Sequence, residues 1–194
     1  MHQSGVILDK DSDYGAVDLP SVTQLLPKQN FFVSDERLEE LAAEGTANHA
    51  EVEEMLKTSV STSPLTDAVQ KFINNDVKQL GLGKLLYFEQ PLISEKNKFK
   101  GKPDMVFENG IVDLKRSISN KNYHALQLAG YELLCMDAGI YSEDLNCTSF
   151  ILVATPQGQY GLHRVYTSMA GKVFRMLLNR HYTNIFIENY LNSQ

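Results

Sequence analysis

The chain has 194 residues, of which 43% are hydrophobic and 22% are charged, and its formal net charge is −6. These values are typical of a single globular domain that can bury a sizeable core. Because the field of an acidic chain repels phosphate, nucleic-acid binding would need a locally basic surface or bound metal ions. The two cysteines, Cys135 and Cys147, form no cluster, which argues against a disulfide framework, a zinc site and an iron–sulfur cluster.

The sequence lacks signals that direct a chain to a membrane or out of the cell. No apolar run approaches the roughly 18 residues of a membrane-spanning helix. The first residues, MHQSGVILDKDSDYG, carry neither a basic start nor an apolar secretion core. We therefore expect a cytoplasmic protein, in the host cytoplasm if the chain is viral.

The first third of the chain predicts an arm followed by helices. Residues 1–30 carry scattered proline, glycine and aspartate without periodicity, which predicts an N-terminal arm ahead of a single domain at 31–194. Ser34 and the acids after it predict a helix that runs to about residue 57, either kinked or divided at Gly45. A serine and a proline then predict a second helix over residues 63–80.

The period then changes to that of strands. The predicted elements are a strand at 84–93, two strands flanking Asn109-Gly110, a helix at about 122–138, strands at 147–155 and 160–166, and an amphipathic helix at about 168–191. This order predicts an α/β domain with a central mixed sheet flanked by helices.

The segment GKPDMVFENGIVDLKRS places charged residues inside an apolar run. Asn-Gly between alternating runs predicts a two-residue type I′ hairpin loop, which pairs Val106 with Asp113 and Asp104 with Lys115. Side chains alternate along strands, so each face of the hairpin has its own set. One face carries Asp104, Val106, Asp113 and Lys115, and the other, apolar face carries Met105, Phe107, Val112 and Leu114.

Two chemical interpretations fit the charged face. Adjacent carboxylates repel each other, and a divalent cation removes that cost; oxygen ligands of this kind suit Mg²⁺ or Mn²⁺. Lys115 would then orient a metal-bound water or stabilise charge that develops in the transition state. Alternatively, the face is a solvated sheet edge on which Asp104 and Lys115 form a cross-strand ion pair.

Pro-Asp followed by Asp-Leu-Lys across a hairpin resembles the PD-(D/E)xK nuclease superfamily, with Asp104 and Asp113 as the acids and Lys115 as the lysine. Downstream, HALQLAGYELL places Gln127 and Tyr131 four residues apart on one helix face. This pair is similar to the Q-x-x-x-Y motif of the RecB-like and lambda-exonuclease-like branch. Read alone, it is equally the polar edge of an amphipathic helix.

Upstream, EGTANHAEVE resembles the G-T-x-x-H-x-x-x-E helix of the same branch, with His49 at the metal-ligand position. Read alone, His49 is a surface helix histidine. Glu89 occupies the strand where many relatives keep a glutamate, although a structural pair would also explain it. The resemblance covers about residues 38–155. Without iron–sulfur cysteines, the chain is more similar to phage-type exonucleases and the mitochondrial genome maintenance exonuclease.

The resemblance implies a restriction-endonuclease-like αβββαβ core and a metal-dependent DNA exonuclease acting in recombination, repair or the processing of phage or mobile-element DNA. It implies one or two Mg²⁺ or Mn²⁺ ions and no iron–sulfur cluster. The implied ligands are His49, Asp104, Asp113 and the backbone carbonyl of Leu114, with Glu89 as a further candidate. Lys115, Gln127 and Tyr131 would act with Asp104 and Asp113 in catalysis.

DNA, as single strands or duplex ends, is the expected partner, with a recombination or single-strand-binding protein as a second. The run EKNKFKGK alternates lysines, which an extended strand would point to one side; the alternative is a solvated strand end. The expected DNA contacts are Lys96, Lys98, Lys100, Lys102, Arg116 and Lys121, with Lys172, Arg175 and Arg180 as weaker candidates. The rival functions are a structure-specific or restriction-type endonuclease and a catalytically idle nucleic-acid-binding module.

Overall fold

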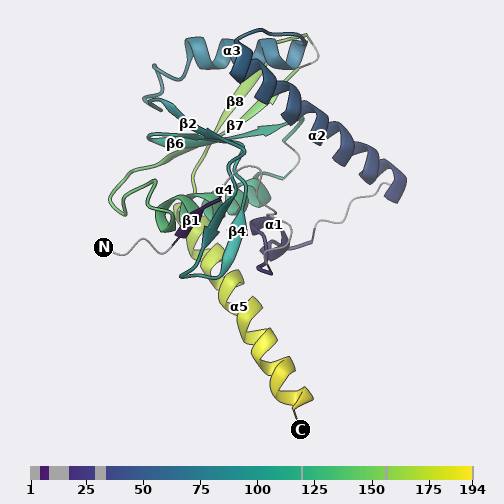
Figure 1. Cartoon of the computed structure of the whole chain (residues 1–194), viewed down its shortest axis with the longest axis vertical. Helices are drawn as coiled ribbons and strands as arrows, with labels where there is room; N and C mark the ends of the chain where they lie inside the picture. Colours follow the sequence, from purple (N-terminus) through teal and green to yellow (C-terminus); the bar gives the residue numbers. More distant parts are fainter. Residues whose placement is uncertain (1–4, 9–17, 29–33, 119, 156, 194) are drawn as a thin grey trace.

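The computed structural model describes residues 5–8, 18–28, 34–118, 120–155 and 157–193, which form a mixed α/β structure (Figure 1). Its larger sheet has the strand order β2-β5-β6-β7-β8. The strands are β2 (Leu85–Phe88), β5 (Met105–Phe107), β6 (Gly110–Lys115), β7 (Thr148–Ala154) and β8 (Tyr160–Val165). Only the β6–β7 pair is parallel among these. Helix α4 (Lys121–Asp137) makes the crossover that a parallel pair requires. The predicted mixed sheet with flanking helices is confirmed.

A smaller antiparallel sheet, with the order β1-β3-β4, involves part of the segment that was expected to be an arm. Its strands are β1 (Gly5–Ile7), β3 (Leu92–Ser94) and β4 (Phe99–Gly101). The short helix α1 (Val22–Leu25) buries Val22 completely in the main apolar cluster. The described parts of residues 1–30 therefore pack onto the body. Elements this short have no periodicity, which is why sequence patterning misses them.

The remaining helices are α2 (Asp35–Thr58), α3 (Pro64–Asn75) and α5 (Ser168–Asn192). Helix α2 is continuous through Gly45, so neither the predicted kink nor a division interrupts its hydrogen bonding. Helix α3 begins at a capping box in which Ser63 and Thr66 satisfy each other's backbone N–H groups. It ends before the predicted residue 80, because the following residues form turns. No described helix has both the length and the apolar character needed to cross a bilayer.

Helices cover both faces of the larger sheet (Figure 1). On one face, Val106 and Ile111 belong to an apolar cluster with α4, which in turn contacts α1 and α5. On the other face, Met105 and Phe107 belong to a second cluster with residues of α2 and α3. The charged residues of β6 are therefore enclosed between layers and do not lie on a solvated edge.

The hairpin turn differs from the prediction. Phe107 pairs with Gly110, so Glu108 and Asn109 form the two-residue connection, and neither they nor Gly110 has a positive φ. The prediction of a type I′ turn at Asn109-Gly110 is therefore wrong. Glycine is needed at 110 for another reason: a Cβ there would collide with the Thr148 carbonyl oxygen and would lie 2.5 Å from the Leu82 side chain.

The corrected register leaves the predicted faces intact. The observed pairs, Met105 with Val112 and Val106 with Ile111, extend by one step to place Asp104 opposite Asp113. The partner of Asp113 therefore moves by two residues, and only a shift by an odd number exchanges the faces of a strand. The two carboxylates end up closer to each other than the predicted register would have placed them.

Candidate metal centre

Asp104 and Asp113 are both buried, with 6% and 0% of their surface exposed. Asp104 directly precedes β5, and its Oδ2 accepts a hydrogen bond of 2.7 Å from the backbone N–H of Leu114. The N–H and C=O of one residue point to the same edge of a strand. The Leu114 carbonyl, an expected metal ligand, therefore lies along the edge that faces Asp104.

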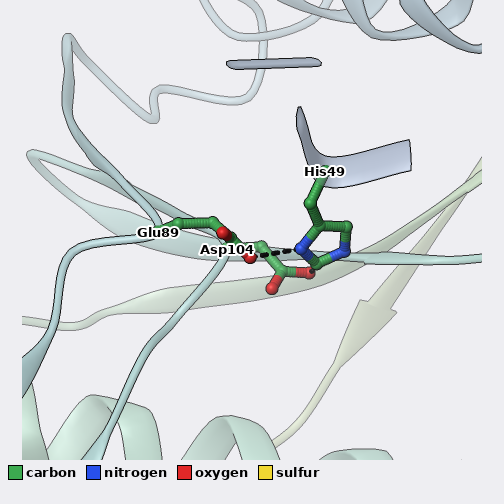
Figure 2. A group of neighbouring side chains, drawn as sticks. All are labelled: His49, Glu89 and Asp104. Atoms are coloured by element: carbon green, nitrogen blue, oxygen red, sulfur yellow. Dashed lines mark hydrogen bonds and ion pairs between the residues drawn. The ribbon is translucent and has the colours of Figure 1, made fainter. Parts of the chain in front are cut away.

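His49 and Glu89 converge on Asp104 from different elements (Figure 2). His49 lies on α2, and Glu89 follows β2 with a φ of +47°. The Glu89 N–H donates to the Asp104 carbonyl at 2.8 Å, which fixes this unusual conformation. His49 Nδ1 bonds to Glu89 Oε1, and His49 Nε2 lies 3.9 Å from Asp104 Oδ2.

The three residues have the spacing of a ligand set. One ligand atom from each of His49, Glu89 and Asp104 lies within 4.8 Å of the others. Ligands held 2.0–2.6 Å from an ion are separated by up to about 5 Å. One divalent ion can therefore contact all three side chains with little adjustment.

The electrostatics of this group depend on burial and on paired charges. Burial, followed by the charge of Asp113, raises the pKa of Asp104 to about 7. Burial opposes the ionisation of Glu89, but hydrogen bonds from His49 and Lys102 outweigh it and hold its pKa at about 2. The hydrogen bond to Glu89 raises the pKa of His49 in spite of burial. Of the three groups, only Asp104 has its ionised form disfavoured, because it is buried beside Asp113, and a cation bound here would favour that ionised form.

Asp113 and Lys115 form an ion pair on the same strand face, with Oδ2 and Nζ 2.7 Å apart. Burial opposes the charge of Lys115, but Asp113 and Asp104 outweigh it and raise the pKa of the ammonium group. Asp113 Oδ1 accepts no hydrogen bond within the described part of the chain. A buried carboxylate oxygen without a partner is costly. A bound cation would satisfy it, so these residues fit a metal ion.

Helix α4 places Gln127 and Tyr131 in the interior beside β6. Each is 6% exposed, and Gln127 Nε2 donates to the Tyr131 hydroxyl at 3.2 Å. Within the described residues, Gln127 Oε1 lacks a hydrogen-bond partner. The structure thus shows the two residues as a hydrogen-bonded pair inside the molecule.

Sequence reasoning missed two residues one turn earlier on α4. The charge of Lys115 affects the pKa values of both Tyr123 and His124. Burial raises the pKa of Tyr123, and the positive charge of Lys115 partly offsets this rise. Burial and then Lys115 lower the pKa of His124. His124 lies three residues before Gln127 and seven before Tyr131, so helical spacing could have placed it on the same face.

The predicted lysine array is not a single strand face. Strand β4 begins only at Phe99, and Lys96 and Lys98 lie in the turn before it, where Lys98 has a φ of +53° and pairs with Glu95. Lys100 is only 7% exposed. Lys102 pairs with Glu89 at 2.8 Å and so borders the candidate centre. A left-handed turn residue breaks the alternation on which the prediction depended.

A cavity of about 640 Å³ gives access to the centre, and we call it the first cavity. Its lining includes Gly45, His49, Pro64, Lys115, Arg116 and Thr155. The side chains of His49 and Lys115 are each 24% exposed. Arg116 at its rim pairs with Glu44 of α2. The cavity therefore brings Lys115 and Arg116 to one opening with His49 and Leu114, two of the candidate ligands.

Comparison with known proteins adds no assignment. No protein-family model matches the chain, and no curated protein matches it in sequence.

Proposed function

We propose that this protein is a divalent-metal-dependent deoxyribonuclease that hydrolyses phosphodiester bonds. The observation that carries the proposal is the burial of Asp104 and Asp113 on one face of the hairpin, beside Lys115, which lines an open cavity. Burying two carboxylates together lowers stability, so an arrangement of this kind points to a functional role. Metal-assisted phosphodiester chemistry is a role that uses all three residues.

The element order supports a restriction-endonuclease-like core and membership of the PD-(D/E)xK superfamily, which we include in the proposal. Strands β2, β5 and β6 are consecutive antiparallel neighbours in the larger sheet, and α4 then leads to β7, parallel to β6. With α2 and α3 ahead of them, these elements follow the expected αβββαβ order.

His49, Glu89 and Asp104 would hold one ion, with Asp113 and the Leu114 carbonyl as the remaining candidate ligands. A divalent ion at this place supplies charge neutralisation at the phosphate and a more acidic water. The imidazole in the set favours Mn²⁺ somewhat over Mg²⁺.

Lys115 would serve the reaction directly. Its ammonium group has donors and no acceptor, so it cannot be a ligand while protonated. Asp113 holds it in place at 2.7 Å, and only 24% of its side chain is exposed. A fixed cationic donor in such surroundings stabilises charge that grows on the phosphate or orients the attacking water.

A cleavage assay tests the proposal. End-labelled linear DNA and closed circular DNA are incubated with Mg²⁺, Mn²⁺, Ca²⁺ or EDTA. We expect Mg²⁺ or Mn²⁺ to support shortening of linear DNA, and we expect Ca²⁺ to bind without supporting turnover, because it holds its ligands in a looser geometry. Survival of the circle would indicate an exonuclease, and its cutting an endonuclease. Full activity in EDTA, or binding without cleavage under every condition, would contradict the proposal.

A further inference from the structure

A second cavity, of about 440 Å³, lies between the start of α4 and the end of β8. Its lining includes Ile118, Lys121, Asn122, Arg164 and Tyr166. The first cavity extends along the chain to Arg116, and the second begins at Ile118. Two residues of chain span at most about 7 Å. The linings of the two cavities therefore come close to each other at this point, where only Ser117 separates them in sequence.

The second cavity is locally basic. None of its lining residues is acidic, although the chain as a whole has a formal net charge of −6. Lys121 and Arg164 are exposed and make no ion pair within the described residues. This is the kind of local surface that an acidic protein needs for contact with phosphates.

The same cavity presents an open aromatic ring. Tyr166 is 77% exposed, the largest value among the exposed large hydrophobic side chains of the described chain. The guanidinium carbon of Arg164 lies over the ring, 5.5 Å from its centroid. A cation on one side of a tyrosine ring and solvent around the rest leaves ring surface free for stacking. Nucleobases stack on such rings irrespective of sequence.

We infer that the second cavity binds an unpaired stretch of a nucleic-acid strand, with a base stacked on Tyr166 and phosphates next to Lys121 and Arg164. The volume suits one nucleotide-sized group, and stacking on a side chain requires a base that is free of its duplex neighbours. The inference depends on the proposed function in one respect: the strand held here continues to the first cavity, where it is cleaved.

Fluorescence tests the stacking contact directly. The chain contains no tryptophan, so Tyr166→Trp introduces a single reporter at the proposed contact. The matched control is Tyr190→Trp on α5, because Tyr190 is also exposed, at 58%, and lies outside both cavities. Each variant is titrated with a thymidine oligonucleotide and with inorganic polyphosphate, in Ca²⁺ and in EDTA.

We expect saturable quenching of the reporter at position 166 by the oligonucleotide and none by polyphosphate, which has charge but no bases. The reporter at position 190 should not respond. Absence of quenching at position 166, or equal quenching at both positions, would overturn the inference. Repeating the titration with an RNA oligonucleotide and a blunt duplex shows whether sugar or pairing matters; preference for the duplex would also overturn it.

Affinity measurements on unlabelled variants separate this inference from the proposed function. We expect Tyr166→Ala to weaken single-strand binding by about 5- to 150-fold, since stacking contributes about 1–3 kcal/mol per base, whereas Tyr166→Phe should bind like the wild type. If the wild type cleaves DNA but Tyr166→Ala binds and cleaves normally, only this inference fails. If no DNA is cleaved but the reporter is quenched, only the proposed function fails.

Discussion

The two cavities on either side of Ser117 differ in the burial and the charge of their neighbouring side chains. Beside the first, the charged groups of the candidate centre are buried and paired: Asp113 is completely buried, and Lys115 is held against it. In the second, Lys121, Arg164 and Tyr166 are exposed and carboxylates are absent from the lining. Fixed charges in a water-poor site lower stability but are strong in a transition state, whereas exposed cations and rings bind a strand without such a cost. Substitutions in the first cavity should change the rate, and those in the second the affinity.

The largest effect should come from Asp113→Asn. This change removes one negative charge from the centre and leaves Lys115 without its ion-pair partner, so cleavage should fall below detection and Mn²⁺ affinity should drop with it. Calorimetric titration of Mn²⁺ beside the cleavage assay measures both, and circular dichroism checks the fold. Retention of wild-type turnover would show that the hairpin carboxylates are not the catalytic centre.

Lys115→Met should separate chemistry from binding. Methionine retains an unbranched side chain but has no donor, and loss of one preorganised donor costs about 10²–10³ in rate. Mn²⁺ affinity and single-strand affinity in Ca²⁺ should remain close to wild type. Lys57→Met is the matched control, because Lys57 is an exposed lysine of α2 that pairs with Glu53 and lines neither cavity. If Lys115→Met cleaves DNA at the same rate as the control, Lys115 is only an ion-pair partner of Asp113 and has no role in catalysis.

The double change Lys121→Ala and Arg164→Ala should affect the second cavity alone. Each phosphate contact to a single strand contributes about 0.7 to the slope of log affinity against log salt. The double variant should therefore lower the magnitude of that slope by about 1.4, with the maximal cleavage rate unchanged. Measuring affinity from low to moderate salt gives the slope, and an unchanged slope would place the strand elsewhere.

The smallest effect concerns stability without metal. The pKa of Asp104 is raised to about 7 in the folded protein from an ordinary value of 3.8, so the folded state binds more protons than the unfolded state between these values. Stability should fall as pH rises through this interval. The raised pKa of His49 acts in the same direction, because its ion pair stabilises the fold below its unfolded pKa and is lost as pH rises through the folded one.

Asp104→Asn removes the carboxylate and should raise the stability of EDTA-treated protein at pH 8, on the order of 1 kcal/mol or more. For a domain of this size the melting temperature rises by about 2–4 °C per kcal/mol. Thermal melts at pH 5 and pH 8 should show the gain chiefly at the higher pH. An equal gain at both values would mean that desolvation of Asp104 is not the cause.

The sequence alone determined the composition of the hairpin faces. Alternation places Asp104, Asp113 and Lys115 on one side, and Phe107 and Leu114 on the other, in every hairpin register whose loop has an even number of residues. The Asn-Gly pair could not predict the register. It suits a type I′ turn, but glycine is required at 110 because other residues approach it closely. That need, the approach of Thr148 and Leu82, comes from residues that are distant in sequence.

Tertiary structure alone decided which residues meet. His49 and Glu89 are separated by 40 positions, and only the packing of α2 over the second apolar cluster brings them to Asp104. Likewise, the crossover through α4 sets Lys121 beside Arg164 and Tyr166 of the β8 edge. Local patterning determines which side of an element a residue occupies, since it depends on neighbours two to four positions away. Convergence of separate elements depends on how their apolar faces are buried together, which no local pattern specifies.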